Sequence, residues 1–153
     1  MTPDERLAKL GLVLPPPPQP AADYVESKQV GRMLYLAGHG PIDGDQITTG
    51  QVGGSLTLEQ GVAAAELTGL SLLSTMRAAV GLDAIDAIVS VLGLVYAVPG
   101  FTEHPTVIDG CSKLFVEVFG KERGTHTRSA IGVASLPFGI PVEIECVALL
   151  KEE

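Results

Sequence analysis

The order of apolar segments predicts an α+β domain, a two-layer α/β sandwich in which two helices pack on one face of a six-stranded mixed sheet. Residues 57–80 and 104–120 carry apolar side chains at helical spacing, which indicates two helices with broad buried faces. The stretches around them are short, rich in β-branched residues and bounded by Gly or Pro, which favours strands. The predicted order is β-β-β-α-β-α-β-β.

The first residues are expected to form an arm. Apolar residues at helical spacing predict a short amphipathic helix over residues 2–12. Pro15–Pro18 end this helix and favour an extended polyproline segment. We expect residues 1–20 to lie across a single domain made by residues 21–153, in preference to being the ligand of a proline-recognition domain.

Three strands are predicted before the first long helix. Residues 23–30 and 33–37 are predicted to be the two strands of a hairpin, and Gly31–Arg32 its turn. The Gly-rich stretch 38–45 is expected to be a loop, and residues 46–52 a third extended piece.

The helix ends carry clear local signals. Thr57 and Gln60 match a capping box, and Gly81 is a natural stop. Pro105 suits the first helical position of the second long helix, which is expected to end near Gly120.

The remaining strands follow the two helices. Residues 88–96 predict a buried central strand. Residues 125–135 and 141–151 are predicted as strands joined by a turn at 136–140, so we expect them to pair as a hairpin.

Composition narrows the class of protein. The chain has 153 residues, of which 46% are apolar, and this length suits one domain with a sizeable core. Ten Lys and Arg against 18 Asp and Glu give a net charge of −8, which provides no general attraction to phosphate backbones. We therefore expect no nucleic-acid partner.

Targeting signals and cysteine pairing are also not expected. The first residues lack the basic start and apolar run of a signal peptide, and no stretch of about 18 apolar residues predicts a membrane span. We expect a cytoplasmic protein without a membrane partner. Cys111 and Cys146 are expected to be two small buried hydrophobic residues rather than a disulfide.

The final pair of strands holds the most informative polar residues. His126, Arg128 and Ala130 are alternate residues of the predicted strand and so share one face. The residues between them, together with Ile131, are expected to face the core. On the last strand Glu143 and Glu145 share a face, so an Arg and two Glu are expected on the same side of one hairpin. Such an Arg suits a carboxylate ligand and such a Glu a general base. A cross-strand salt bridge on a solvated face is the alternative.

Other polar residues form no familiar catalytic or metal motif. His39 lies in a Gly-flanked stretch that can approach a ligand, or has no role. His39, His104 and His126 lack metal-ligand spacing, and neither Cys sits in a recognisable Cys-His motif. We expect no metal and no cofactor.

Two blocks of sequence stand out when they are taken together. The C-terminal block is Arg128–Pro137 followed by Pro141–Glu145, and the N-terminal block comprises Tyr24, Gly31, Leu36–Asp43 and Gly50. These blocks resemble the YjgF/RidA family, whose members are also called endoribonuclease L-PSP or translation initiation inhibitors. The resemblance extends from about residue 20 to residue 150.

The resemblance implies a chorismate-mutase-like fold and a homotrimer with three clefts between subunits. It implies hydrolysis of 2-imino and enamine acids, such as 2-aminoacrylate, to 2-keto acids and ammonia without a cofactor. The substrate would be a small-molecule carboxylate.

The resemblance also assigns site residues. Arg128 matches the arginine that binds the substrate carboxylate, and Glu143 the glutamate that positions the attacking water. Tyr24 matches a tyrosine that lines the cleft, and Asp109 falls near an asparagine of the second helix. His39 stands where the family has Gln in a Ser-Gly-Gln loop.

Several departures place the chain in a less characterised branch. Ala130 replaces the family's usual cysteine two residues after the arginine, and the N-terminal arm is longer. A non-catalytic trimer that binds or senses a small carboxylate is the alternative function; it needs Arg128 but not Glu143. An RNase or translation inhibitor would need a basic surface, which the net charge does not support.

Overall fold

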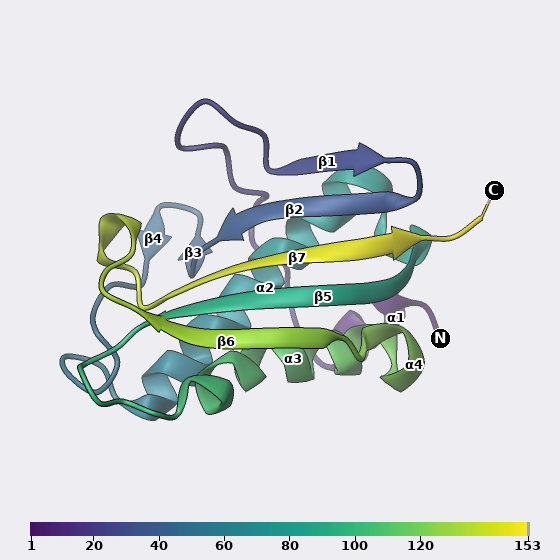
Figure 1. Ribbon diagram of the computed structural model, residues 1–153. Coiled ribbons are helices and arrows are strands. Elements are labelled where there is room, and N and C mark those ends of the chain that lie inside the picture. The colour runs from purple at the N-terminus through teal and green to yellow at the C-terminus, as the bar shows by residue number, and fades with distance from the viewer. Residues whose placement is uncertain (153) are drawn as a thin grey trace.

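The computed structural model describes residues 1–152, which form a layer of helices against one face of a sheet (Figure 1). The sheet has five strands in the order β1-β2-β7-β5-β6. The strands of this sheet are β1 (Ser27–Val30), β2 (Met33–His39), β5 (Ile85–Tyr96), β6 (Thr127–Val133) and β7 (Val142–Leu150). The helix layer consists mainly of α2 (Leu58–Val80) and α3 (His104–Phe119). The predicted α+β two-layer class is confirmed, with five strands in the main sheet rather than six.

The missing sixth strand is a separate small hairpin. Within the predicted piece 46–52, only Gln46–Ile47 (β4) is a strand, and it pairs with Ile42–Asp43 (β3). Gly44, with a φ of 60°, makes the tight turn between them. Val52 then forms isolated bridges to Leu56 and Ala97. The segment therefore adds no strand to the main sheet.

The predicted hairpin between β6 and β7 is wrong. β6 pairs in parallel with β5, and β7 lies between β5 and β2, antiparallel to both. The β5–α3–β6 unit is a crossover connection, which is how parallel neighbours are joined. The chain therefore places β6 at the edge of the sheet and brings β7 back on the other side of β5 (Figure 1).

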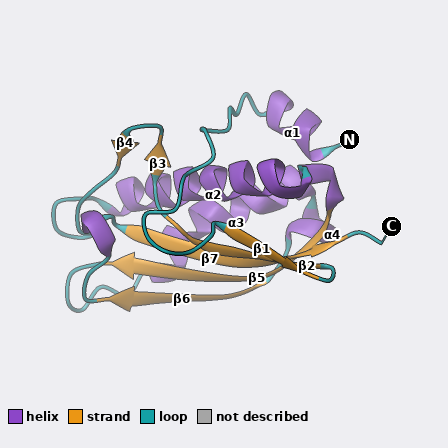
Figure 2. Cartoon of the chain, turned by 90° about the horizontal axis from the view of Figure 1, so that it is seen from above, coloured by secondary structure: helices purple, strands orange, loops and turns teal. Residues whose placement is uncertain are grey.

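The faces of β6 are also the reverse of the prediction. Ile131 is 48% exposed, and Thr127 and Ser129 are exposed with it. His126 and Arg128 instead contact α3. Because helices cover only one face of the sheet, the alternate set on β6 lies on the uncovered face (Figure 2).

The helix ends agree with the local signals. The Thr57 hydroxyl accepts from the Gln60 N–H at 3.1 Å, and the Thr57 N–H donates to the Gln60 side chain at 2.8 Å. α2 ends at Gly81 and α3 at Gly120, as predicted. Lys121–Gly124, between α3 and β6, form a short helix, α4. Among residues 1–152, none of the helices is both long and apolar enough to cross a membrane.

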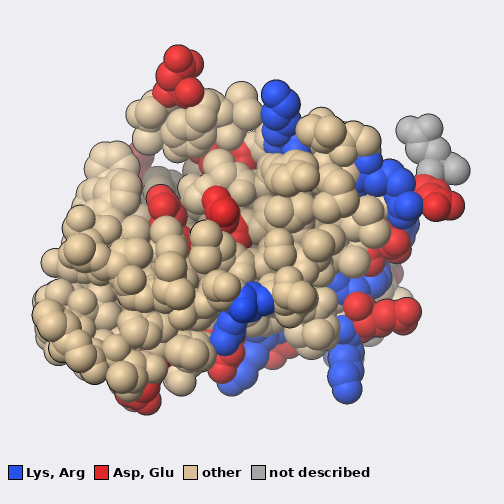
Figure 3. Space-filling model, viewed as in Figure 1, with Lys and Arg blue, Asp and Glu red and all other residues tan. Residues whose placement is uncertain are grey.

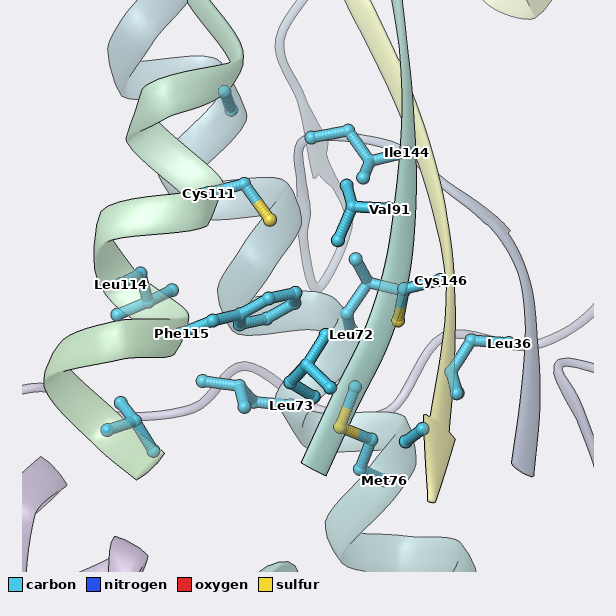
Figure 4. Close-up of a cluster of buried hydrophobic side chains, with 14 of the residues drawn as sticks. Leu36, Leu72, Leu73, Met76, Val91, Cys111, Leu114, Phe115, Ile144 and Cys146 are labelled. Atoms are coloured by element: carbon cyan, nitrogen blue, oxygen red, sulfur yellow. The ribbon is translucent and has the colours of Figure 1, made fainter. Parts of the chain in front are cut away.

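Large apolar side chains join the two layers (Figure 4). Phe115 of α3 and Leu72 of α2 are fully buried against Val91 of β5. Each such side chain contributes roughly 1.5–3 kcal/mol through burial. Cys111 and Cys146 lie in this core as free thiols, which confirms the expectation for both.

The N-terminal arm runs over the helix layer (Figure 2). Its helix, α1 (Pro3–Lys9), is capped by Thr2 and buries Leu7, and Asp4 pairs with Arg77 of α2. Further along, the Ser74 hydroxyl of α2 donates to the Pro15 carbonyl at 2.5 Å. The proline segment then reaches the end of the sheet that carries β3 and β4, where Pro18 lines a cavity together with Ile42 and Ile47.

Gly110 sets the approach of the two long helices, and we expect Gly110→Ala to destabilise the protein. An added Cβ would overlap the Val62 carbonyl oxygen of α2, which cannot rotate away. The net loss should be about 1–3 kcal/mol, although alanine favours helix by about 1 kcal/mol. Gly69→Ala is the matched control, because its Cβ meets the movable Leu114 and Cys111 side chains at 2.9 and 3.2 Å. Urea unfolding of both variants measures the difference; equal losses would contradict this account.

Candidate functional site

The predicted site residues fall into two groups on opposite faces of the sheet. Val91 of β5 pairs with both Arg128 and Cys146, so these three side chains begin on the helix-covered face. Glu143 lies three residues before Cys146 and therefore begins on the uncovered face. The prediction that Arg128, Glu143 and Glu145 emerge on the same side is wrong, because β5 separates β6 from β7 and the register sets opposite orientations.

The first group surrounds Arg128 at the sheet edge. The guanidinium donates to the Asp109 carboxylate at 2.8 Å, to the Ser112 hydroxyl at 3.1 Å and to the Pro105 carbonyl at 3.3 Å. All three partners belong to α3, and the Arg128 side chain is 20% exposed. The expected proximity of Asp109 is therefore observed. Ala130, on the same face, packs against the core.

Ser112 and His126 extend this group. The His126 Nδ1 lies 2.6 Å from the Gly124 carbonyl, which only accepts, so Nδ1 carries the proton and Nε2 accepts from the Ser112 hydroxyl at 2.9 Å. Burial, reinforced by the nearby charge of Arg128, lowers the pKa of His126. Arg128, Ser112 and His126 thus form a row of hydrogen bonds that ends at a neutral imidazole. Sequence reasoning missed Ser112, although it lies three residues after Asp109 on one helix face.

The second group lines a small cavity of about 80 Å³ at the other end of the sheet. Tyr24, His39 and Glu143 line it, together with Glu26 and Phe138. Among the described residues that line the cavity, none is Lys or Arg. Figure 3 shows acidic but no basic side chains on the left part of this face, the end that carries β3 and β4. The cavity is therefore an acidic environment.

The carboxyl group of Glu143 is packed against the backbone of β2. A Cβ at Gly38 would lie 2.9 Å from the Glu143 Cδ, so glycine at this position allows the close approach. Burial, and then the neighbouring charge of Glu145, raises the pKa of Glu143. A half-buried carboxyl group with a raised pKa is suited to exchanging a proton with a bound water.

His39 lies behind the cavity rather than in an exposed loop. It is the last residue of β2 and is only 2% exposed. Its Nδ1 lies 2.6 Å from the Ala37 carbonyl, and its Nε2 lies 2.8 Å from the Thr75 hydroxyl and 3.3 Å from a Glu26 carboxyl oxygen. Burial lowers the pKa of His39 and raises that of Glu26.

The remaining cavity residues come from the arm and from one strained turn. Tyr24 is half exposed, and its hydroxyl accepts from the Ala21 N–H at 3.3 Å. Phe138 adopts a φ of 60° and is mostly exposed at the rim. Sequence reasoning missed Glu26 and Phe138. Glu26 follows Tyr24 by two residues, a spacing that places both on one side of an extended segment. Within residues 1–152, no group of three or more His, Cys, Asp or Glu side chains is placed to hold a metal ion.

A family model described as "Endoribonuclease L-PSP" matches residues 16–150. The chain belongs to the endoribonuclease L-PSP family. This is the YjgF/RidA family that the two sequence blocks resemble, and the resemblance is confirmed. Residues 1–15, which include α1, lie outside the region that the family model matches.

Individual family members are similar over nearly the whole chain. Protein TCP17 of Trypanosoma cruzi is 42% identical over 147 residues, which cover 95% of this chain and 92% of that protein. The structure of Atu1372 from Agrobacterium tumefaciens, a protein of unknown function, is 35% identical with a TM-score of 0.88, covering 97% of this chain and 92% of its own. A candidate endoribonuclease from Shewanella oneidensis is 30% identical with a TM-score of 0.94, covering 98% and 100%.

The buried His39 should make the fold sensitive to mild acid. Its lowered pKa stabilises the folded chain above the ordinary histidine value of 6.5, and this stability is lost as the pH falls toward the folded-state pKa. We expect the unfolding free energy of wild type to fall more steeply between about pH 7 and 5 than that of His39→Gln. His126 acts in the same direction and the raised carboxyl pKa of Glu143 acts oppositely, but both are present in the two proteins, so the difference reports on His39 together with its contact to Glu26. Urea unfolding at several pH values gives the slopes, and parallel slopes would refute this assignment.

Proposed function

We propose that the protein is a hydrolytic deaminase that converts 2-imino and enamine acids of the 2-aminoacrylate type to 2-keto acids and ammonia. Arg128 binds the substrate carboxylate, and Glu143 positions the attacking water. The observation that carries the proposal is Glu143, a half-buried carboxyl group with a raised pKa in a small cavity, within a chain of the L-PSP family. Tyr24, His39, Asp109 and Ala130 surround these two residues in the proposed site.

Hydrolysis of an imine requires few catalytic groups from the protein. An imine carbon is already electrophilic, so holding substrate and water together supplies much of the acceleration. A carboxylate that removes a proton from the water adds about 10²–10⁴-fold. The cavity of about 80 Å³ suits a small reacting group and a water, and excludes a bulky side chain.

The proposal includes a homotrimer, because one chain does not bring its two main residues together. Arg128 lies on the helix-covered face at the sheet edge, and Glu143 on the other face. A site that uses both would join the Arg128 edge of one subunit to the Glu143 cavity of the next. The uncovered face also exposes Tyr35, Val89 and Ile131, an apolar surface that suits contact with other copies.

The second candidate is a non-catalytic trimer that binds a small carboxylate. The Arg128 environment favours it, since Asp109 and Ser112 hold the guanidinium in one orientation at the sheet edge. RNA is not the proposed substrate. The cavity is lined by Glu26 and Glu143, and the net charge is −8, so phosphate groups would be repelled.

The deaminase is tested by competition with semicarbazide, which traps imines released by an amino-acid oxidase or a dehydratase. We expect wild type to divert the imine to the keto acid. Glu143→Gln should lower kcat by about 10²–10⁴-fold with little change in KM. Arg128→Lys should mainly raise KM, because lysine lacks the bidentate fork. Arg32→Lys and Glu122→Gln, both at exposed positions, are the matched controls.

The same assay separates the two candidates. No diversion of several imino acids by wild type, together with Arg128-dependent binding of keto acids in calorimetry, would favour the binding protein. Activity that survives Glu143→Gln would show that the water is held by another group.

Intersubunit sites predict complementation between inactive variants. If each cleft takes Arg128 from one subunit and Glu143 from its neighbour, co-expressed Arg128→Ala and Glu143→Gln chains should regain activity in about a quarter of the clefts. Each variant alone should remain inactive. Light scattering gives the oligomeric state of the mixed sample. Mixed trimers without regained activity would place both residues in the same subunit's site.

A further inference from the structure

The cavity holds a second carboxyl group that the proposed hydrolysis does not use. Glu26 lines it together with Glu143, and its side chain is 13% exposed. One Glu26 carboxyl oxygen lies 3.3 Å from His39 Nε2. Since the described residues lining the cavity include no Lys or Arg, this imidazole is the basic partner that the cavity offers to Glu26.

The surroundings of His39 fix where a proton resides. The Ala37 carbonyl at 2.6 Å accepts but cannot donate, so His39 Nδ1 carries a hydrogen. The nitrogen that can gain or lose a proton is therefore Nε2, which faces Glu26 and the Thr75 hydroxyl. The Thr75 hydroxyl can either donate to Nε2 or accept from it, so it tolerates both states. The pair can therefore share one proton, placed either on the Glu26 carboxyl or on Nε2.

We propose that the Glu26–His39 pair is the proton donor to the substrate nitrogen, acting opposite Glu143. This role rests on the proposed deaminase function. Glu26 is the more exposed member of the pair, with a side chain 13% exposed against 0% for His39, and His39 is a positioning residue that fixes the carboxyl and supports its proton.

The two carboxyl groups give a balanced reaction. The Glu143 carboxylate removes a proton from water as the oxygen bonds to the imine carbon. The C=N electron pair moves to nitrogen, which takes the proton of Glu26, giving a neutral carbinolamine. In the second step the Glu26 carboxylate takes the hydroxyl proton as C=O forms, the C–N bond breaks, and Glu143 returns its proton to the leaving ammonia. Both groups end in their starting states.

The electrostatics support this division of roles. Burial raises the pKa of Glu26 and lowers that of His39, and both directions favour a shared proton on the carboxyl over one on the imidazole. The other titratable groups facing the cavity are Tyr24 and Glu143. Glu143 cannot accept a proton from water and donate one to nitrogen in the same step, so a separate donor completes the reaction.

Glu26→Gln tests the proposal, because it keeps the shape of the side chain and removes its proton. We expect kcat in the imine assay to fall on the order of 10²-fold, with KM little changed, and the alkaline limb of the kcat–pH profile to disappear. His39→Gln should retain part of the activity and shift that limb to a different pH. Glu122→Gln, at an exposed site on α4, is the control.

A measurement independent of activity checks the proton itself. In protein with ¹³C-labelled Glu carboxyl groups, one resonance should titrate above the ordinary value of 4.5 and vanish in Glu26→Gln. Titration of Glu26 at or below that value overturns the inference. An active wild type with unchanged kcat and pH profile in Glu26→Gln overturns the role of Glu26 alone. An inactive wild type overturns the proposed function, and the donor role with it.

Discussion

Helices cover one face of the sheet, and the alternation of side chains along each strand then decides where every polar group points. Val91, Arg128 and Cys146 share a register position on the covered face, so Arg128 turns toward α3 and finds Asp109 there. Glu143 lies three residues before Cys146, so its side chain begins on the uncovered face and lines the cavity at the His39 end of β2. The two residues that a carboxylate-binding hydrolase needs are separated by this one constraint. For the proposed deaminase, this separation would require a contact between copies of the chain to complete the site.

Local signals in the sequence predicted the helices well, and strand partners poorly. The Thr57–Gln60 box and Gly81 act within a few residues of the structure they determine, so they could be recognised directly. The pairing of β6 with β5 instead joins residues more than thirty positions apart, and it requires α3, which connects the two strands in the chain, to pack over the sheet. Sequence proximity suggested a β6–β7 hairpin, but a crossover helix that must cover the sheet favours the parallel neighbour.

The candidate site shows the same division. Arg128, Glu143 and Tyr24 were identified through their sequence blocks, and the structure shows which of them share a cavity. The Glu26–His39 contact could not be predicted, because β2 changes register between Leu36 and His39 and so turns the imidazole inward toward α2. No residue type in that stretch signals such an irregularity.

Burying Glu26 and His39 carries an energetic cost that the fold does not need. A carboxyl group and an imidazole in a half-closed cavity must give up hydration, and apolar residues of similar volume often stabilise such positions equally well or better. The directions of the two pKa shifts reflect this cost. Burial raises the pKa of Glu26 and lowers that of His39, so it favours the neutral form of each group. A polar pair that opposes folding, beside a carboxyl group that also resists ionisation, is better explained by proton transfer than by stability. In the proposed deaminase, the same burial that disfavours the ionised forms of these groups would suit them to exchanging protons with a small substrate.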